Sequence, residues 1–180
     1  IIIGAGPGGY ETAVAAAKKG LSVAIVEKSD LGGTCLNCGC IPTKCLCHTA
    51  EVLELVKESA SHGISTNDVQ FDIQNAIERK NQVVSQLQSG IDALIKIPGI
   101  TLYRGEAQLV DTNTVNVLVD DSNGTKDVVG TIKGQNIIIA TGSITKFLPI
   151  EGAHAQGVVT STEMLNLTSI PKRLCIIGGG

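Results

Sequence analysis

A glycine-rich turn between two strongly patterned segments limits the possible folds more than any other feature of the chain. Residues 1–3 form an apolar run that ends at glycine, as a buried strand of a parallel sheet does. Residues 8–19 are rich in alanine and predict a helix that ends at Gly20, and residues 21–26 return to a strand pattern. This strand–helix–strand unit of about 27 residues predicts an α/β fold with a parallel sheet.

The glycines of this turn are spaced as G-x-G-x-x-G, and each has a physical role. Gly4 permits a tight turn, Gly6 lets the backbone approach a pyrophosphate, and Gly9 lets helix and strand pack closely. Glu27 stands at the end of the next strand, where a carboxylate can accept hydrogen bonds from a ribose. Together they predict a dinucleotide site at the helix N-terminus. The alternative is an ordinary strand-to-helix turn with an acid there by chance.

Helical and strand patterns alternate along the rest of the chain. Apolar residues at three- or four-residue steps predict helices over about 34–60 and 72–96, and the second helix faces the core. A period-two pattern between 101 and 133 predicts a β-meander. Apolar runs at 137–140 and 174–177 end in glycine and predict further buried strands.

These patterns indicate how the chain is divided. We expect residues 1–148 to form a Rossmann-like domain with a parallel sheet and a meander packed on one side. Residues 149–180 would connect it to a second nucleotide-binding domain and begin that domain. The chain starts at Ile1 without a methionine and stops at Gly180 within glycines. It therefore reads as part of a longer protein.

Composition and charge narrow the classes of function. Hydrophobic residues make up 43% and charged residues 17% of the chain, which favours a packed core over disorder. The net charge of −3 gives no electrostatic footprint for nucleic acid. Since no apolar run approaches the ~18 residues of a membrane span, we expect neither nucleic acid nor membrane as a partner.

The cysteines are clustered in one segment. Of 6 cysteines, all but Cys175 lie between positions 35 and 47. Disulfide scaffolds of secreted proteins spread their cysteines along the chain, so this clustering favours a redox site or a metal site. A metal module would draw its soft ligands from Cys35, Cys38, Cys40, Cys45, Cys47 and His48. Their spacing lacks the two separated C-x2-C pairs of a zinc ribbon.

Helix geometry restricts which of these cysteines can form a disulfide. In a regular helix, Cα atoms five residues apart lie about 8.7 Å from each other and those three apart about 5 Å. A disulfide needs less than about 7 Å. Cys35 and Cys40 can therefore pair only where the helix is distorted, which Gly39 would permit. Cys35 and Cys38 could pair in a regular helix.

The segment from Gly32 to Lys44 reads GGTCLNCGCIPTK. It resembles the redox signature of the FAD-dependent pyridine nucleotide-disulfide oxidoreductases, and its Ile-Pro-Thr-Lys ending resembles the dihydrolipoamide dehydrogenases among them. The resemblance extends over the chain, including Ala140-Thr141-Gly142-Ser143 and the closing Ile-Ile-Gly-Gly-Gly. A third thiol at Cys38 departs from the family pattern. We expect Cys38 to be a half-buried small side chain, with an alternative exchange partner as the sharper hypothesis.

The resemblance implies a role for each matching residue. Cys35 would exchange with the dithiol substrate, Cys40 would lie against the flavin, and Lys44 would sit near the reactive end of the flavin. The FAD-binding residues it implies are Gly4, Gly6, Gly9, Glu27, Lys28, Gly32, Gly33, Thr34, Lys44, Ala107, Thr141 and Gly142. Gly178 and Gly180 would begin the NAD-binding turn. No residue is expected to bind a metal.

The other cysteines and His48 have no role in the family pattern. We expect Cys45 and Cys47 to pack in the core, His48 to be structural, and Cys175 to be inert in a buried strand.

The implied activity is that of an FAD-dependent disulfide oxidoreductase that oxidises protein-bound dihydrolipoamide and passes hydride to NAD. Its partners would be lipoyl domains of 2-oxoacid dehydrogenase or glycine cleavage complexes, in a cytoplasmic homodimer. Residues 1–180 alone would not turn over. Reduction of a glutathione-like disulfide or of Hg(II) is the nearest alternative, and a cysteine-rich metal module is the alternative from another class.

Overall fold

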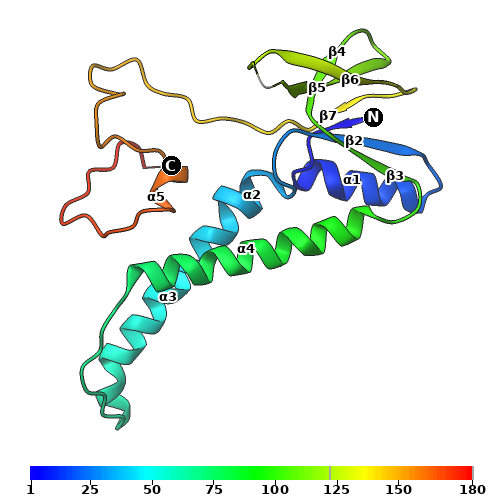
Figure 1. Cartoon of the computed structure of the whole chain (residues 1–180). Coiled ribbons are helices and arrows are strands. Elements are labelled where there is room, and N and C mark those ends of the chain that lie inside the picture. The colour runs from blue at the N-terminus through cyan, green and yellow to red at the C-terminus, as the bar shows by residue number, and fades with distance from the viewer. Residues whose placement is uncertain (122, 180) are drawn as a thin grey trace.

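The computed structural model describes residues 1–121 and 123–179 and confirms the α/β fold (Figure 1). One sheet has four parallel strands in the order β3-β2-β1-β7, and the other has three antiparallel strands in the order β4-β5-β6. The strands are β1 (Ile2–Ile3), β2 (Val23–Glu27), β3 (Ile100–Arg104), β4 (Glu106–Leu109), β5 (Thr114–Asp120), β6 (Lys126–Lys133) and β7 (Ile138–Ile139).

Local sequence signals mark the starts of two of the helices. They are α1 (Pro7–Lys18), α2 (Gly33–Cys38), α3 (Cys40–Glu58), the 3₁₀ turn η1 (Ser59–His62), α4 (Ile73–Ile95) and α5 (Ser161–Met164). Proline opens α1, where its missing N–H is not needed. The side chain of Asp72 caps α4 by accepting hydrogen bonds from the backbone N–H groups of Gln74 and Asn75. None of the described helices is long and apolar enough to cross a membrane.

The parallel sheet separates two apolar clusters because successive residues of a strand face opposite sides. On one side, Ile2 and Ile25 pack with residues of α1 and α4. On the other, Ile3 and Val26 pack against Val115 and Val117 of the small sheet. Each fully buried side chain of this size contributes about 1.5–3 kcal/mol to folding. Figure 1 shows α1 and α4 below the parallel sheet and the small sheet above it.

The prediction of a meander starting at residue 101 was wrong at its first strand. Residues 100–104 pair with β2 in the parallel sheet, with Val23 opposite Ile100 and Glu27 opposite Arg104. Gly105, with φ +150°, then turns the chain into the antiparallel sheet. A Cβ at Gly105 would lie 2.6 Å from the carbonyl oxygen of Leu118, so only glycine fits this crossing point. The strand alternation was correctly identified, but its partner lies far away in sequence.

The strand predicted at 174–177 does not form. Ile176 and Ile177 are 76% and 70% exposed, and no strand lies among residues 141–179. Cys175 is also exposed, which contradicts its predicted burial. An apolar run becomes a buried strand only when neighbouring strands and a covering layer accompany it. The run at 137–140 has one neighbour and forms only the short edge strand β7, whose isoleucines remain exposed.

Candidate functional site

The turn after β1 is closed too tightly to hold side chains. Gly4 has φ +101°, and a Cβ there would lie 2.3 Å from the carbonyl oxygen of Ala140. A Cβ at Gly9 would lie 1.9 Å from the carbonyl oxygen of Gly4. Both clashes are with backbone atoms, which cannot move aside as a flexible side chain can. The turn therefore brings the start of α1 and the end of β7 to the same point.

A second glycine pair brings another loop to this turn. Gly32, the N-cap of α2, has φ +96°, and Gly33, its first residue, has φ +59°. A Cβ at Gly33 would lie 2.7 Å from the Cα of Gly6, so the two backbones touch. The N–H of Gly32 also donates to the carbonyl of Ala5 at 2.9 Å. The loops after β1 and β2 thus meet at the carboxyl end of the sheet, where open α/β sheets bind ligands.

Glu27 ends β2 and is held by backbone donors. One carboxylate oxygen accepts the N–H of Ala5 at 2.7 Å, and the other accepts the N–H of Ser29 at 2.8 Å. A carboxylate offers about four acceptor positions, so the two backbone bonds leave capacity for two hydroxyl groups. The carboxylate is therefore fixed in place while it can still receive a ribose.

The groups around this turn fit a dinucleotide. No side chain caps α1, so the positive end of a 12-residue helix is available to a phosphate. Gly4 and Gly9 leave no room for side chains where the backbone must approach the ligand. Thr34 lies exposed on α2, and Lys28 lies exposed just beyond β2. Their contacts with FAD remain predictions.

The three remaining predicted FAD residues lie in segments whose backbone reaches this turn or β2. Ala107 follows Gly105, whose N–H donates to the carbonyl of Glu27 at 2.9 Å. Thr141 has its Cα 3.3 Å from the position that a Cβ of Gly4 would take, and Gly142 follows it with φ +71°. Gly178 has φ +107°, and its role in an NAD-binding turn remains a prediction. Gly180 lies outside the described residues.

The single helix predicted over 34–60 is broken at Gly39. Gly39 has φ −139° and ψ −106° and separates α2 from α3. A Cβ there would lie 2.9 Å from the carbonyl oxygen of Thr34, so the chain folds back against the first turn of α2. This is the distortion at Gly39 that the five-residue spacing of Cys35 and Cys40 requires. Both cysteines are free thiols, Cys35 half-buried and Cys40 exposed.

The break places the side chains of Cys35 and Cys40 against each other. Hydrogen bonding with the Cys40 thiol raises the pKa of Cys35, and burial raises it further. The positive charge of Lys44, four residues after Cys40 on α3, acts to lower the pKa of Cys35. The structure therefore brings together the three residues for which a catalytic role was predicted, with the lysine favouring the thiolate.

A pocket of about 380 Å³ opens beside Cys35. Its walls come from α1, α2 and its N-cap, the first turn of α3, and α4, and they carry no charged side chain. The lining residues are Pro7, Tyr10, Gly32, Cys35, Leu36, Ile41, Leu87, Gly90, Ile91 and Leu94. The α4 residues were missed because the helix was interpreted only as core-facing. Gly90 was the available signal. A glycine inside a helix weakens the helix, so its presence there suggests that space is needed beside it.

The other cysteines lie apart from this pair. Cys38 is half-buried as predicted, whereas Cys45 is half-buried and not in the core where it was predicted. Cys47 is exposed, so its predicted place in the core was wrong, because it lies on the outer face of α3. Among residues 1–121 and 123–179, no three His, Cys, Asp or Glu side chains lie close enough together to hold a metal ion.

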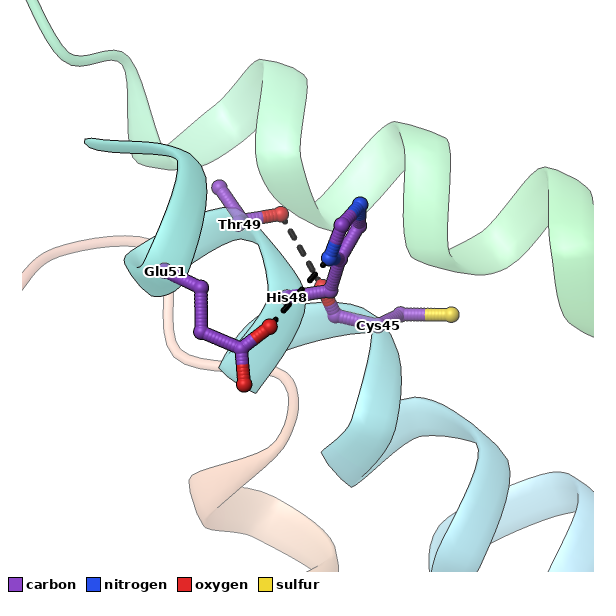
Figure 2. Close-up of polar contacts among 4 residues, drawn as sticks. All are labelled: Cys45, His48, Thr49 and Glu51. Atoms are coloured by element: carbon purple, nitrogen blue, oxygen red, sulfur yellow. Dashed lines mark hydrogen bonds and ion pairs between the residues drawn. The ribbon is translucent and has the colours of Figure 1, made fainter. Parts of the chain in front are cut away.

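Figure 2 shows the surroundings of His48 and Cys45 on α3. The Nδ1 atom of His48 lies 3.3 Å from a carboxylate oxygen of Glu51, and the Thr49 hydroxyl donates to the carbonyl of Cys45 at 3.0 Å. The Cys45 sulfur extends away from the imidazole. His48 is thus part of an exposed pair one turn apart on the helix, in line with a structural role.

Known proteins resemble this chain over its whole length. Residues 1–180 match the family model described as pyridine nucleotide-disulphide oxidoreductase. The dihydrolipoyl dehydrogenase of Acholeplasma laidlawii is 44% identical over 185 residues, covering 100% of this chain and 52% of that protein. The dihydrolipoyl dehydrogenase of Geobacillus stearothermophilus is 42% identical over 180 residues, covering 100% of this chain and 37% of that protein. A leghemoglobin reductase of Vigna unguiculata is 41% identical over 182 residues, covering 100% of this chain and 34% of that protein.

A solved structure also resembles this chain. The Cu(II) complex of the HOCl-induced flavoprotein disulfide reductase RclA from Escherichia coli matches with a TM-score of 0.71 at 34% identity. That match covers 94% of this chain and 34% of RclA. The chain spans about a third to a half of the length of the relatives described here. Since the family model matches from the first residue to the last, the chain belongs to the pyridine nucleotide-disulphide oxidoreductase family.

Proposed function

We propose that this chain is the FAD-binding part of a dihydrolipoyl dehydrogenase, which oxidises protein-bound dihydrolipoamide and passes the electrons to NAD. The observation that carries the proposal is the position of Cys35, which lines an apolar pocket on one side and meets Cys40 on the other. A dithiol that enters this pocket reaches a cysteine pair that can accept its two electrons. The relatives named dihydrolipoyl dehydrogenase support the same assignment.

The proposed chemistry is thiol–disulfide exchange at Cys35. In the oxidised protein a disulfide joins Cys35 and Cys40, and one substrate thiolate attacks the sulfur of Cys35. The bond to Cys40 breaks, and Cys40 leaves as a thiolate near the positive charge of Lys44. The second substrate thiol then attacks the mixed disulfide, which releases a cyclic disulfide and leaves Cys35 reduced. Bound FAD would take the two electrons from the cysteine pair and pass hydride to a nicotinamide.

The residues around the glycine turn would hold the FAD. The N-terminus of α1 would face its pyrophosphate, and Glu27 would accept hydrogen bonds from its adenosine ribose. Gly4, Gly6 and Gly9 would let the backbone approach the ligand. Lys44 would lie near the reactive end of the flavin, where a fixed positive charge favours the reduced, anionic form.

The lining of the pocket favours a lipoyl arm over the two alternative substrates within the family. Glutathione-like disulfides carry several charges, and the pocket offers none to receive them. Hg(II) would bind to the thiols alone, so apolar walls would not contribute to its binding. An aliphatic chain that ends in two sulfurs would bury its methylenes against Leu87, Ile91 and Leu94 at about 0.8 kcal/mol each.

The remaining parts of the proposal concern the complete protein. Residues 149–180 would lead into an NAD-binding domain, and later segments would complete the FAD-binding domain of residues 1–148. The enzyme would act as a cytoplasmic homodimer on the lipoyl domains of 2-oxoacid dehydrogenase or glycine cleavage complexes.

The test compares three cysteine variants in the complete protein, with NAD-dependent oxidation of dihydrolipoamide as the assay. Cys35→Ser and Cys40→Ser should each abolish turnover, because each removes one half of the redox pair. Cys38→Ser is the matched control in the same segment and should retain most of the activity. Glutathione disulfide and Hg(II) serve as competing substrates. Equal loss in all three variants, or faster turnover of a competing substrate, would overturn the assignment.

A further inference from the structure

Lys80 on α4 is a lysine in the interior, which needs an explanation. The residue is 3% exposed, and Ala76, one turn earlier on the same helix, is 8% exposed. Lysine is among the residue types that proteins bury least often, because removing its charge from water is costly. An apolar side chain at this position would pack without that cost. The lysine is therefore expected to make an interaction that an apolar residue cannot make.

The ammonium group of Lys80 binds the C-terminal end of α5. It donates to the carbonyl of Leu165 at 3.0 Å and to the side-chain oxygen of Asn166 at 2.6 Å. Burial lowers the pKa of Lys80, while the nearby Cys45 on α3 acts to raise it. Leu165 is the C-cap of α5, where helix carbonyls lack partners and a cation is favoured. Lys80 thus satisfies groups of α5 from a helix 85 positions earlier in sequence.

The helix α5 depends on such support because it has four residues, far fewer than a helix needs to be stable alone. At its N-terminus, the side chains of Thr160 and Glu163 form a capping box. In the described chain, two hydrogen bonds join residues 149–179 to residues distant in sequence, and Lys80 donates both of them. Lys80 is therefore the main polar anchor of this segment.

The helix α4 carries both Lys80 and one wall of the pocket beside Cys35. Leu87, Gly90, Ile91 and Leu94 line the pocket beside Cys35, and they follow Lys80 on α4. On α3, Cys45 lies near Lys80 and follows Cys40 within the first turns of that helix. Figure 1 shows α5 beside the end of α4 that lies next to α3. Lys80 thus joins the connecting segment to α4, the helix that forms one wall of the pocket beside Cys35.

We propose that Lys80 is a positioning residue that docks the connecting segment on α4 and thereby sets where the following NAD-binding domain lies relative to the flavin. The inference rests on the proposed function. Hydride transfer between nicotinamide and flavin depends on the placement of two domains. Exchange between the dithiol and the Cys35–Cys40 pair uses residues of α1 to α4 within the first domain, and it does not depend on where the second domain lies. Loss of the anchor therefore slows the nicotinamide step selectively.

The test uses the complete protein and the substitution Lys80→Met, which keeps the length of the side chain and removes its donors. Lys96→Met is the matched control, because Lys96 is the exposed C-cap of the same helix and forms an ion pair with Asp92. Flavin reduction is followed in single turnovers, once with NADH and once with dihydrolipoamide. We expect Lys80→Met to slow reduction by NADH by about tenfold, since a 1 Å displacement can cost up to about a hundredfold. Reduction by dihydrolipoamide should change by less than about twofold, as should both reactions in Lys96→Met.

Amide hydrogen exchange gives a second measurement that does not depend on activity. The amides of residues 161–166 should exchange faster in Lys80→Met than in Lys96→Met, because α5 loses its anchor. Asn166→Ala removes one acceptor from an exposed position and should produce a smaller change in the same direction, even if Lys80→Met does not fold. Unchanged exchange, or equal slowing of both flavin reactions, would overturn the inference. Faster exchange in a protein that does not oxidise dihydrolipoamide would leave the anchor standing and refute the proposed function.

Discussion

Residues 1–3 and 174–177 are both strand-like apolar runs that end in glycines, but only the first run is followed by a packed turn. At the first, Ile2 is 2% exposed, and the glycines that follow touch backbone atoms on three sides. At the second, Ile176 is 76% exposed, and nothing lies within 4 Å of a Cβ at Gly178 or Gly179. The same local sequence pattern thus gives opposite outcomes. The difference lies in paired strands and a following helix, which the first run has and the second lacks in the described residues.

The comparison is tested most strongly by adding one methyl group to each turn. Gly9→Ala should lower the free energy of unfolding of the chain by about 3 kcal/mol or more, because the added Cβ meets the backbone oxygen of Gly4. Gly179→Ala should change it by less than about 0.5 kcal/mol. Urea denaturation followed by circular dichroism measures both. A similar loss in the two variants would show that the second turn is already packed.

The apolar runs themselves offer the next contrast. Ile2→Ala removes a side chain buried in the larger core cluster and should cost about 2–4 kcal/mol of stability. Ile176→Ala removes a side chain that is mostly exposed and should cost almost nothing in the same denaturation experiment. Repeating Ile176→Ala in the complete protein sharpens the contrast. A cost that appears only there would show that later segments bury the second run.

The smallest expected effect concerns the thiols of the two regions. Cys40→Ala removes the hydrogen bond that is the main cause raising the pKa of Cys35, so the midpoint of Cys35 alkylation should move to lower pH. Lys44→Met removes a charge that stabilises the thiolate, so it should move that midpoint to higher pH. Iodoacetamide labelling with mass spectrometry follows each cysteine separately. Cys175, in the open region, serves as the internal control, and its profile should not change in either variant.

Local patterns predicted local structure well. The apolar stripe of α4 placed that helix over 72–96, within one residue of Ile73–Ile95 at each end. The five-residue spacing of Cys35 and Cys40 required a broken helix, and the break lies at Gly39. In both cases the controlling interactions are between residues a few positions apart, so the sequence pattern contains the information that decides them.

Features that depend on distant partners could not be predicted in this way. The alternation of residues 100–104 indicates a strand but not that it pairs with β2. Lys80 has the sequence context of a polar helix face, and only α5 covering it makes it an anchor. The pocket beside Cys35 likewise arises from α1, α2, the first turn of α3 and α4 together. Predicting these features requires the tertiary arrangement, which local periodicity does not determine.

The position of β7 beside β1 has a consequence for synthesis on the ribosome. Ile2 pairs with Ile138, so β1 emerges long before the strand that covers its free edge. At about 5–20 residues per second, roughly 7 to 27 s pass before that partner is made. During this time β1 and β2 can pair with each other, but the open edge of β1 can also pair with another nascent chain. Newly made protein is therefore expected to need chaperone protection until translation passes β7, and slower translation between β2 and β7 should lower the yield of folded protein.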